Sequence, residues 1–403
     1  MRRSSILLAT TLLTALASCT PVATTDDASA HFDASVVDAR AEDTSPTEPD
    51  GGEPDGGEPD AAIAPPDAVS AIAGTITSPR TIEGLDYGAV GTAVLTPSDV
   101  LNVVVVGRAI ELVGSAEGGA PPYTMTWRSS LDGPLGTGPR ATVMPTEGEH
   151  DVVLEVMDAT GAIGSSAPLP LHVLPATFDW SHVRRPAAPP AAGDWMTPVR
   201  SQGRCGSCWA MAALAVMEGQ MNIDRGDPSF DVDLSEQTTI DCDMHSIGCA
   251  GGGSEQSLSG YLHDVGAVAE SCNPFLGTDD MCIEGCRDGS TPARYRVEDT
   301  RAVVGDGGAN DAIRAWMRYQ LVHHGPIART IINMLGYDGT THLCAPLGGD
   351  HYVAVVGYDD VAGLWIAKNS WGARWNGDGY MEVSYGNCAI DASATIVTHV
   401  IEP

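Results

Sequence analysis

The fold of this chain is decided by the stretch Gln202-Gly203-Arg204-Cys205-Gly206-Ser207-Cys208-Trp209, which opens a strongly apolar run from Ala210 to Met221. Such a run predicts a buried helix, with Cys208 in its first turn. The N–H groups at the start of a helix lack partners within the helix and carry partial positive charge. Both features favour the thiolate, which is the reactive form of cysteine. We therefore predict that Cys208 is a nucleophile.

A nucleophilic cysteine needs a base, and the base needs a group that orients it. His351 lies in Gly348-Gly349-Asp350-His351-Tyr352, directly before an apolar run that is typical of a strand. Asn369 lies in Lys368-Asn369-Ser370-Trp371-Gly372. These two residues follow Cys208 by 143 and 161 positions, and they are the candidates for the base and the orienting group.

Together these segments resemble the papain-like cysteine peptidases, in which the His and Asn follow the Cys by about 130–150 residues, so Asn369 lies slightly beyond that spacing. The resemblance covers roughly residues 176–403 and implies a two-lobed α+β fold with a helical left lobe and a β-barrel-like right lobe. Three further segments carry it: Leu234-Ser235-Glu236-Gln237 with Asp241-Cys242, Gly248-Cys249-Ala250-Gly251-Gly252, and Gly377-Asp378-Gly379-Tyr380.

The resemblance also implies a role for each site residue. Cys208 would attack the peptide carbonyl, His351 would exchange its proton, Asn369 would orient the imidazole, and Gln202 would bind the oxyanion. Phosphate binding by the glycines is not expected, because no Gly-Lys-Ser/Thr follows them. The expected substrate-binding residues are Gly251, Gly252, Gly253, Ser254, Gly349, Asp350, Tyr352 and Trp371.

The N-terminus has the pattern of an export signal. Arg2 and Arg3 precede a short apolar stretch, and Leu16-Ala17-Ser18-Cys19 resembles a bacterial lipobox. We expect residues 1–19 to be a lipoprotein signal peptide ending at an acylated Cys19, so that the protein is exported and anchored to the cell envelope through lipid. Thr20 is not the Asp that often retains lipoproteins in the inner membrane, so we expect the outer membrane, on a periplasmic or surface-exposed face. The alternative is an ordinary secretory signal in which Cys19 has no role.

Eight cysteines remain once Cys19 and Cys208 are set aside from the ten in the chain. An exported protein can keep them as disulfides. Sequence alone leaves the pairing open. The resemblance implies the bridges Cys205–Cys249, Cys242–Cys282 and Cys344–Cys388, which leaves Cys272–Cys286 as an extra local bridge.

Two regions precede the peptidase-like part. Residues 20–68 are rich in Pro, Gly, Ala and acid, and we expect a disordered linker. Residues 69–175 contain short β-favouring runs and predict a small all-β sandwich with Trp127 in its core, resembling immunoglobulin/PKD-like modules. Such a module is a passive spacer or binds a carbohydrate or protein ligand at the surface. The runs are Leu101–Val106, Ala109–Val113, Tyr123–Trp127, Ala141–Met144 and Val152–Val156.

The favoured function is that of a lipid-anchored, papain-like cysteine endopeptidase acting on proteins or peptides. No His-bearing insertion lies between Cys272 and Arg301, where the family's carboxydipeptidases carry an occluding loop, so an open cleft is expected. Two alternatives remain: a surface-binding lipoprotein whose β module is the working part and whose peptidase fold is inactive, and acyl transfer on the same residues. The net charge of −32 argues against a nucleic-acid partner. No cofactor and no metal site are predicted, and His323-His324 is interpreted as a helix end.

Overall fold

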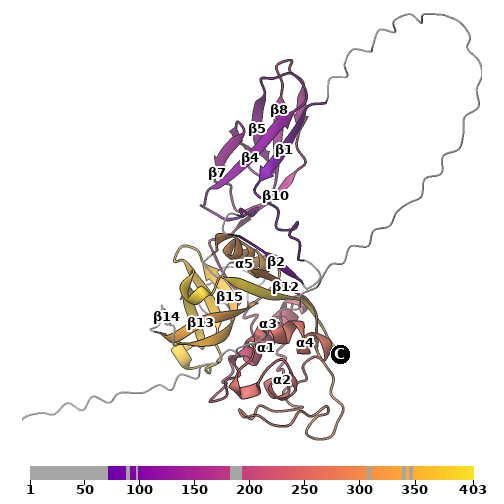
Figure 1. The fold of residues 1–403 in the computed structure, drawn as a ribbon, viewed down its shortest axis with the longest axis vertical. Helices are drawn as coiled ribbons and strands as arrows, with labels where there is room; N and C mark the ends of the chain where they lie inside the picture. The colour runs from indigo at the N-terminus through magenta and orange to yellow at the C-terminus, as the bar shows by residue number, and fades with distance from the viewer. Residues whose placement is uncertain are drawn as a thin grey trace, which may run out of the picture.

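An all-β module stands on a larger two-lobed α+β body (Figure 1). The computed structural model describes residues 71–87, 91–96, 99–181, 193–305, 310–337, 342–344 and 348–403. The expected signal peptide at 1–19, with Cys19, and the expected linker at 20–68 lie outside these residues. The fold class is the one expected from the sequence: a two-lobed α+β body preceded by a small all-β sandwich.

The module consists of two sheets packed face to face. One sheet has the order β1-β4-β7, and the other has the order β3-β10-β8-β5-β6, with β9 added to β8. Trp127 is fully buried between them, and its indole N–H donates to the Gly138 carbonyl at 2.9 Å. The strands are β1 (Ala73–Ser78), β3 (Val103–Val105), β4 (Ile110–Glu117), β5 (Thr124–Ser129), β6 (Gly133–Thr137), β7 (Arg140–Val143), β8 (Gly148–Met157), β9 (Ile163–Ser165) and β10 (Leu169–Leu174).

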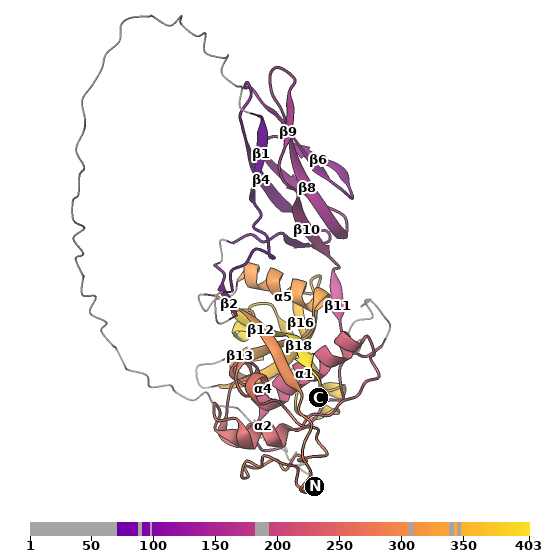
Figure 2. The same cartoon turned by 90° about the vertical axis from the view of Figure 1, so that its right-hand side faces the viewer.

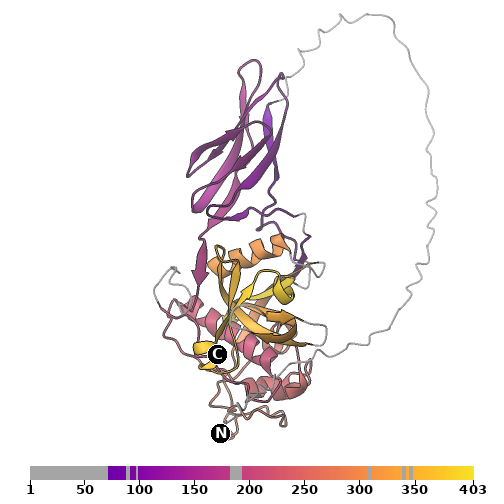
Figure 3. The same ribbon diagram turned by 90° about the vertical axis from the view of Figure 1, so that its left-hand side faces the viewer.

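The β lobe of the body is one curled, mainly antiparallel sheet with the order β17-β16-β15-β13-β18-β12-β2, in which β11 pairs with β15 and β14 pairs with β13. Figure 3 shows this sheet from the side away from the helical lobe. Its strands are β2 (Thr92–Val94), β11 (Thr177–Asp179), β12 (Arg296–Val304), β13 (Ile327–Tyr337), β14 (His342–Cys344), β15 (Gly349–Asp359), β16 (Leu364–Lys368), β17 (Tyr380–Ser384) and β18 (Ser393–Ile401). The short 3₁₀ helices η2 (Trp375–Gly377) and η3 (Asn387–Ala389) lie in its loops.

The helical lobe is built around α1 (Cys208–Arg225), whose side chains are buried from Cys208 to Asn222. A helix that is apolar on all sides must be covered on all sides, and α1 packs on β15 and β18 as well as on α2 and α3. It ends at Gly226, whose left-handed φ of 63° suits glycine. No helix in the described part of the chain is both long and apolar enough to cross a membrane. The other helices are α2 (Glu236–Cys242), η1 (Gly248–Ala250), α3 (Ser254–Ser259), α4 (Tyr261–Asp264) and α5 (Asp311–His323).

The chain between β1 and β3 leaves the module and lies on the body (Figure 2). We call residues 80–87, 91–96 and 99–101 the crossover segment. Its strand β2 pairs in parallel with β12 at the edge of the body's sheet. The Asn310 amide, which also caps α5, donates to the Leu95 carbonyl at 3.0 Å, and the Trp316 indole donates to the Tyr87 hydroxyl at 2.9 Å. This packing differs from the expectation from sequence, which places these residues in the sandwich.

The crossover segment contributes to the core of the body rather than to the core of the module. Leu95 is fully buried in the same apolar cluster as Trp316 and Ile396, while its neighbour Val94 is 68% exposed. We therefore expect Leu95→Ala to lower the free energy of unfolding by about 2–5 kcal/mol, through lost burial and the cavity that remains. Val94→Ala is the matched control and should change it by less than about 0.5 kcal/mol. Denaturant unfolding followed by tryptophan fluorescence measures both, and equal effects of the two variants would show that Leu95 is not part of the body's core.

Candidate active site

Cys208 lies at the start of α1, at the boundary between the two lobes. The turn before it is held by the Cys205–Cys249 disulfide and by the Gly206 N–H, which donates to the Cys249 carbonyl at 2.8 Å. A Cβ on Gly206 would lie 2.5 Å from that carbonyl oxygen, so only glycine allows the approach. The Cys208 side chain is buried, and in this structure it is half of a disulfide.

His351 lies on β15, and three residues of the segment after β16 fix its ring. The Asn369 Oδ1 accepts from His351 Nε2 at 2.7 Å and from the Ser370 N–H at 2.8 Å. Two donors meet at this atom, so it is the amide oxygen, and Nε2 carries the imidazole proton. The Trp371 ring stacks on the imidazole with centroids 4.7 Å apart and 29° between the planes.

The other imidazole nitrogen, Nδ1 of His351, is buried and has no hydrogen-bond partner among the described residues. With Nε2 protonated, Nδ1 presents a lone pair, which makes it the proton-accepting atom of this ring. Burial lowers the pKa of His351 to about 4, and the hydrogen bond that its Nε2–H donates to Asn369 opposes this shift. The ring is thus neutral at pH 7 in the state described, where Cys208 has no thiolate.

Gln202 ties the segment before α1 to the β lobe. Its backbone N–H donates to the Ser370 carbonyl at 2.9 Å, and its side-chain oxygen accepts from the Ser370 hydroxyl at 2.7 Å. Its side-chain nitrogen donates to the Cys205 carbonyl at 2.9 Å. An amide nitrogen carries two N–H bonds, so a second one remains to bind an oxyanion.

The glycines expected to bind substrate lie beside Trp209. A Cβ on Gly252 would lie 2.6 Å from the Trp209 ring, and the Ser254 hydroxyl at the start of α3 donates to the Trp209 carbonyl at 2.8 Å. Gly251 adopts a φ of 141°, and Gly253 precedes α3. The missing side chain at Gly252 therefore allows the close approach of the Trp209 ring.

The remaining expected contacts lie on either side of His351. Gly349, Asp350 and Tyr352 belong to β15, and Tyr352 packs against the apolar cluster that contains Cys208 and Trp209. The Asp350 carboxylate accepts from the Asn333 backbone N–H at 2.9 Å, so in this structure it fixes the neighbouring strand β13 where its pairing with β15 is irregular. Trp371, in the segment after β16, covers the imidazole. The structure thus brings together the segments that contain Cys208, His351 and Asn369.

Three of the expected disulfides are present: Cys205–Cys249, Cys242–Cys282 and Cys272–Cys286. The first ties the start of α1 to the glycine-rich segment. The other two hold the segment between α4 and β12: one bridge lies within this segment, and the other ties it to the end of α2. The expected Cys344–Cys388 bridge involves the side chain of Cys344, which lies outside the described residues.

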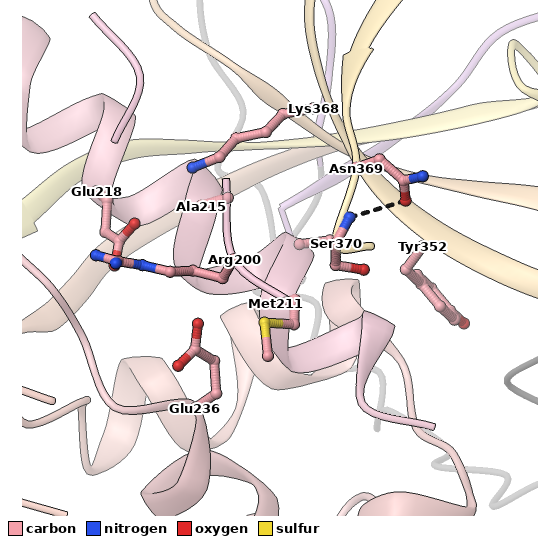
Figure 4. Close-up of a pocket in the computed structure, with 10 residues that line it drawn as sticks. Arg200, Met211, Ala215, Glu218, Glu236, Tyr352, Lys368, Asn369 and Ser370 are labelled. Carbon is pink, nitrogen blue, oxygen red and sulfur yellow. Dashed lines mark hydrogen bonds between the residues drawn. The ribbon is translucent and has the colours of Figure 1, made fainter. Parts of the chain in front are cut away.

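Sequence reasoning missed a buried charged cluster behind the site. Figure 4 shows Lys368 and Arg200 directed towards Glu218 of α1, with Glu236 of α2 opposite. The Lys368 ammonium donates to the Thr197 hydroxyl at 2.8 Å, and that hydroxyl donates to Glu218, which also accepts from the Leu234 N–H at 2.9 Å. Burial, together with the charge of Glu218, raises the pKa of Glu236 to about 8.

This cluster fixes the position of Lys368, which directly precedes Asn369. Lys368 can be buried because Thr197 accepts a hydrogen bond from its ammonium group and Glu218 compensates its charge. The sequence signal was available: Glu218 interrupts the apolar run of α1, and a charge in such a position requires a buried partner.

Comparison with known proteins identifies the family. The profile described as "Papain family cysteine protease" matches residues 174–398, more than half of the chain. The chain is 30% identical over 267 residues to the viral cathepsin of Adoxophyes honmai nucleopolyhedrovirus, covering 63% of this chain and 72% of that protein. It is 33% identical over 223 residues to the viral cathepsin of Cydia pomonella granulosis virus (isolate Mexico/1963), covering 53% of this chain and 59% of that protein.

Among solved structures, the Carica candamarcensis cysteine protease CMS1MS2 in complex with E-64 is 27% identical. That alignment covers 56% of this chain and 99% of the other, with a TM-score of 0.44. The match to the family profile covers both Cys208 and the His351 and Asn369 segments. This chain belongs to the papain family of cysteine proteases and is a cysteine peptidase.

Proposed function

We propose that this chain is a lipid-anchored endopeptidase in which Cys208, His351, Asn369 and Gln202 perform the chemistry. The observation that carries the proposal is the state of His351. Its Nε2 is bound to Asn369, its face is covered by Trp371, and its Nδ1 has no partner among the described residues. A buried nitrogen left without a partner is unfavourable, and a proton-transfer role with a reacting thiol accounts for it.

In the proposed reaction the reduced Cys208 gives its proton to His351 Nδ1, and the thiolate sulfur attacks the peptide carbonyl. The tetrahedral oxyanion accepts hydrogen bonds from the free N–H of the Gln202 amide and from the Cys208 backbone N–H. His351 then protonates the departing amine, which leaves an acyl-enzyme. Water attacks the thioester, gives a proton to His351 and releases the carboxylic acid, and the thiol is restored. Loss of one oxyanion donor reduces the rate by roughly 10²–10³.

Two features of the sequence support cleavage within peptide chains and attachment through lipid. Residues 273–300 contain no histidine, so no His side chain is offered there to bind a substrate's terminal carboxylate, and cleavage within chains is favoured. Leu16-Ala17-Ser18-Cys19 supports acylation at Cys19 and therefore attachment to a bacterial envelope membrane, with the outer membrane favoured by Thr20. In this arrangement the β module separates the peptidase from the anchor.

The catalytic assignment predicts the effect of four substitutions on a fluorogenic peptide assay under reducing conditions. Cys208→Ala and His351→Ala should each lower kcat/KM by roughly 10⁴-fold or more, and the double variant should be no worse than either, because the two act as a unit. Asn369→Ala should cause a smaller loss, since it only orients the ring. His263→Ala, an exposed histidine paired with Asp264, is the control and should be fully active.

Covalent labelling with an epoxysuccinyl inhibitor gives an independent test. The reduced protein should be labelled at Cys208 and the Cys208→Ala variant should not. Unchanged turnover by Cys208→Ala would refute the mechanism. A folded, reduced protein that neither turns over peptides nor takes the label would favour the surface-binding lipoprotein with an inactive peptidase fold.

The environment of His351 predicts how its charge depends on Cys208. Without a thiolate, burial should keep the pKa near 4, so in Cys208→Ala the imidazole stays neutral down to about that pH. The folded-state pKa then lies below the unfolded value of 6.5, so this variant loses stability as pH falls from about 6.5 to about 4. In the reduced native enzyme the thiolate favours the imidazolium, which should persist to higher pH. NMR titration of the His351 ring in both proteins measures this, and a pKa above 6.5 in Cys208→Ala would contradict the assignment.

The lipid anchor predicts the fate of the full-length chain in a bacterial host. The protein should incorporate an alkyne-labelled fatty acid and sediment with membranes, whereas Cys19→Ser should do neither, because no other part of the mature chain is proposed to bind lipid. Mass spectrometry of the mature N-terminus should find acylated Cys19. A labelled Cys19→Ser variant, or an unmodified cysteine in the mature protein, would exclude lipoprotein processing.

A further inference from the structure

Two histidines and a glutamate from three separate elements meet where the module contacts the body. Glu149 comes from β8, His172 from β10, and His323 from the last turn of α5. The ligand atoms that they offer all lie within 4.8 Å of one another. From sequence, His323 is expected to be a helix end and no metal site is predicted. His323 does end α5, and the fold places it opposite residues that are distant in sequence.

The donor atoms converge on one point. His172 Nδ1 lies 2.5 Å from Glu149 Oε2, and His323 Nε2 lies 3.6 Å from Glu149 Oε1. The Tyr319 ring packs against both imidazoles, with centroid distances of 4.7 Å to His172 and 4.4 Å to His323. The His172 side chain is only 8% exposed, while that of Glu149 is 59% exposed, so the cluster is anchored on one side and open to solvent on the other.

Glu83 of the crossover segment orients His172. Its carboxylate bonds to His172 Nε2, and it is itself held by the Asn102 amide at 3.2 Å. With Nε2–H donating to Glu83, the lone pair of Nδ1 is directed towards Glu149 and His323. Such a carboxylate on the far nitrogen is the usual partner of a metal-binding histidine.

The position of His323 argues against a purely protein ion cluster. A doubly protonated His172 could bridge Glu83 and Glu149 without a metal. That arrangement gives no role to His323, whose Nε2 is too far from Glu149 for a hydrogen bond. A metal ion between the three groups uses every one of these atoms.

We propose that Glu149, His172 and His323 bind one Zn²⁺ ion that fastens the β module to the peptidase. Two imidazoles and one carboxylate are a common zinc donor set, with ligand atoms about 2.0–2.2 Å from the metal and a fourth position left for water. In a tetrahedral site, ligands at that distance lie roughly 3.3 Å apart. The present 2.5 and 3.6 Å spacings bracket this value, so small rotations of the Glu149 and His323 side chains suffice.

Zinc titration of the oxidised, signal-free chain carrying Cys208→Ala tests the proposal, because this variant removes the catalytic thiolate as a competing zinc ligand. After removal of metal with EDTA, calorimetry with ZnCl₂ should give one site of higher affinity than any other. The thermal unfolding midpoint should rise with zinc concentration. Co²⁺ should give the intense visible bands of a tetrahedral site. Mg²⁺ and Ca²⁺, which prefer all-oxygen sites, should not raise the midpoint.

Substitutions in the same background assign the ligands. His323→Ala and Glu149→Gln change partly exposed side chains, so the fold should survive, as checked by circular dichroism. Each should abolish the high-affinity site. Glu83→Gln should weaken it roughly 10–100-fold. His324→Ala, next to the site but outside the cluster, is the matched control and should leave zinc affinity unchanged. If zinc does not bind, or binds His323→Ala and Glu149→Gln as tightly as the parent, the site does not exist.

Discussion

The burial of α1 is the constraint on which the rest of this structure depends. An apolar helix with no solvent-facing side has to be covered completely, and here the sheet strands β15 and β18 cover one side while α2 and α3 cover the other. Each lobe thus covers one side of the same helix. Cys208, at the first residue of the helix, necessarily lies where the lobes meet. Glu218, placed in the middle of the helix, then requires the buried partners Thr197 and Leu234.

Polar contacts that cross the lobe boundary give the site its geometry. A chain of hydrogen bonds runs from the Cys205 carbonyl through Gln202 and Ser370 to Asn369 and His351. Each member is buried, so each needs its partner in place. This explains how residues separated by more than 140 positions can be held in fixed orientation. Nδ1 of His351 lies at the end of this chain of hydrogen bonds and is buried without a hydrogen-bond partner among the described residues.

The module and the peptidase contact each other at more points than a single linker would provide. The crossover segment runs from the module into the body, where β2 covers the edge strand β12 and Leu95 enters the core. Elsewhere on the same boundary, Arg108 of the module pairs with Asp360 of the body, which also pairs with Arg318 of α5, and the Tyr358 hydroxyl donates to the Pro175 carbonyl. An edge strand that is already paired cannot recruit another chain. The position of the module relative to the active site is therefore set by packing at several separate points, with the Glu149–His172–His323 cluster among them.

The sequence alone determined the family resemblance, the two-part α+β and all-β architecture, the placement of Cys208 at a helix start and the candidate partners His351 and Asn369. These follow from local signals: an apolar run behind a cysteine, short β-favouring runs between turn residues, and motifs in order along the chain. Only the tertiary structure decided that Glu236 and Lys368 lie in one buried cluster, that Leu95 belongs to the body rather than the module, and that His323 faces His172. Periodicity reports which side of an element is buried but not against which distant element it packs. A strand as short as β2 shows no periodic pattern of its own. Ion and metal clusters are formed by residues far apart in sequence, and only the packed chain brings these residues together.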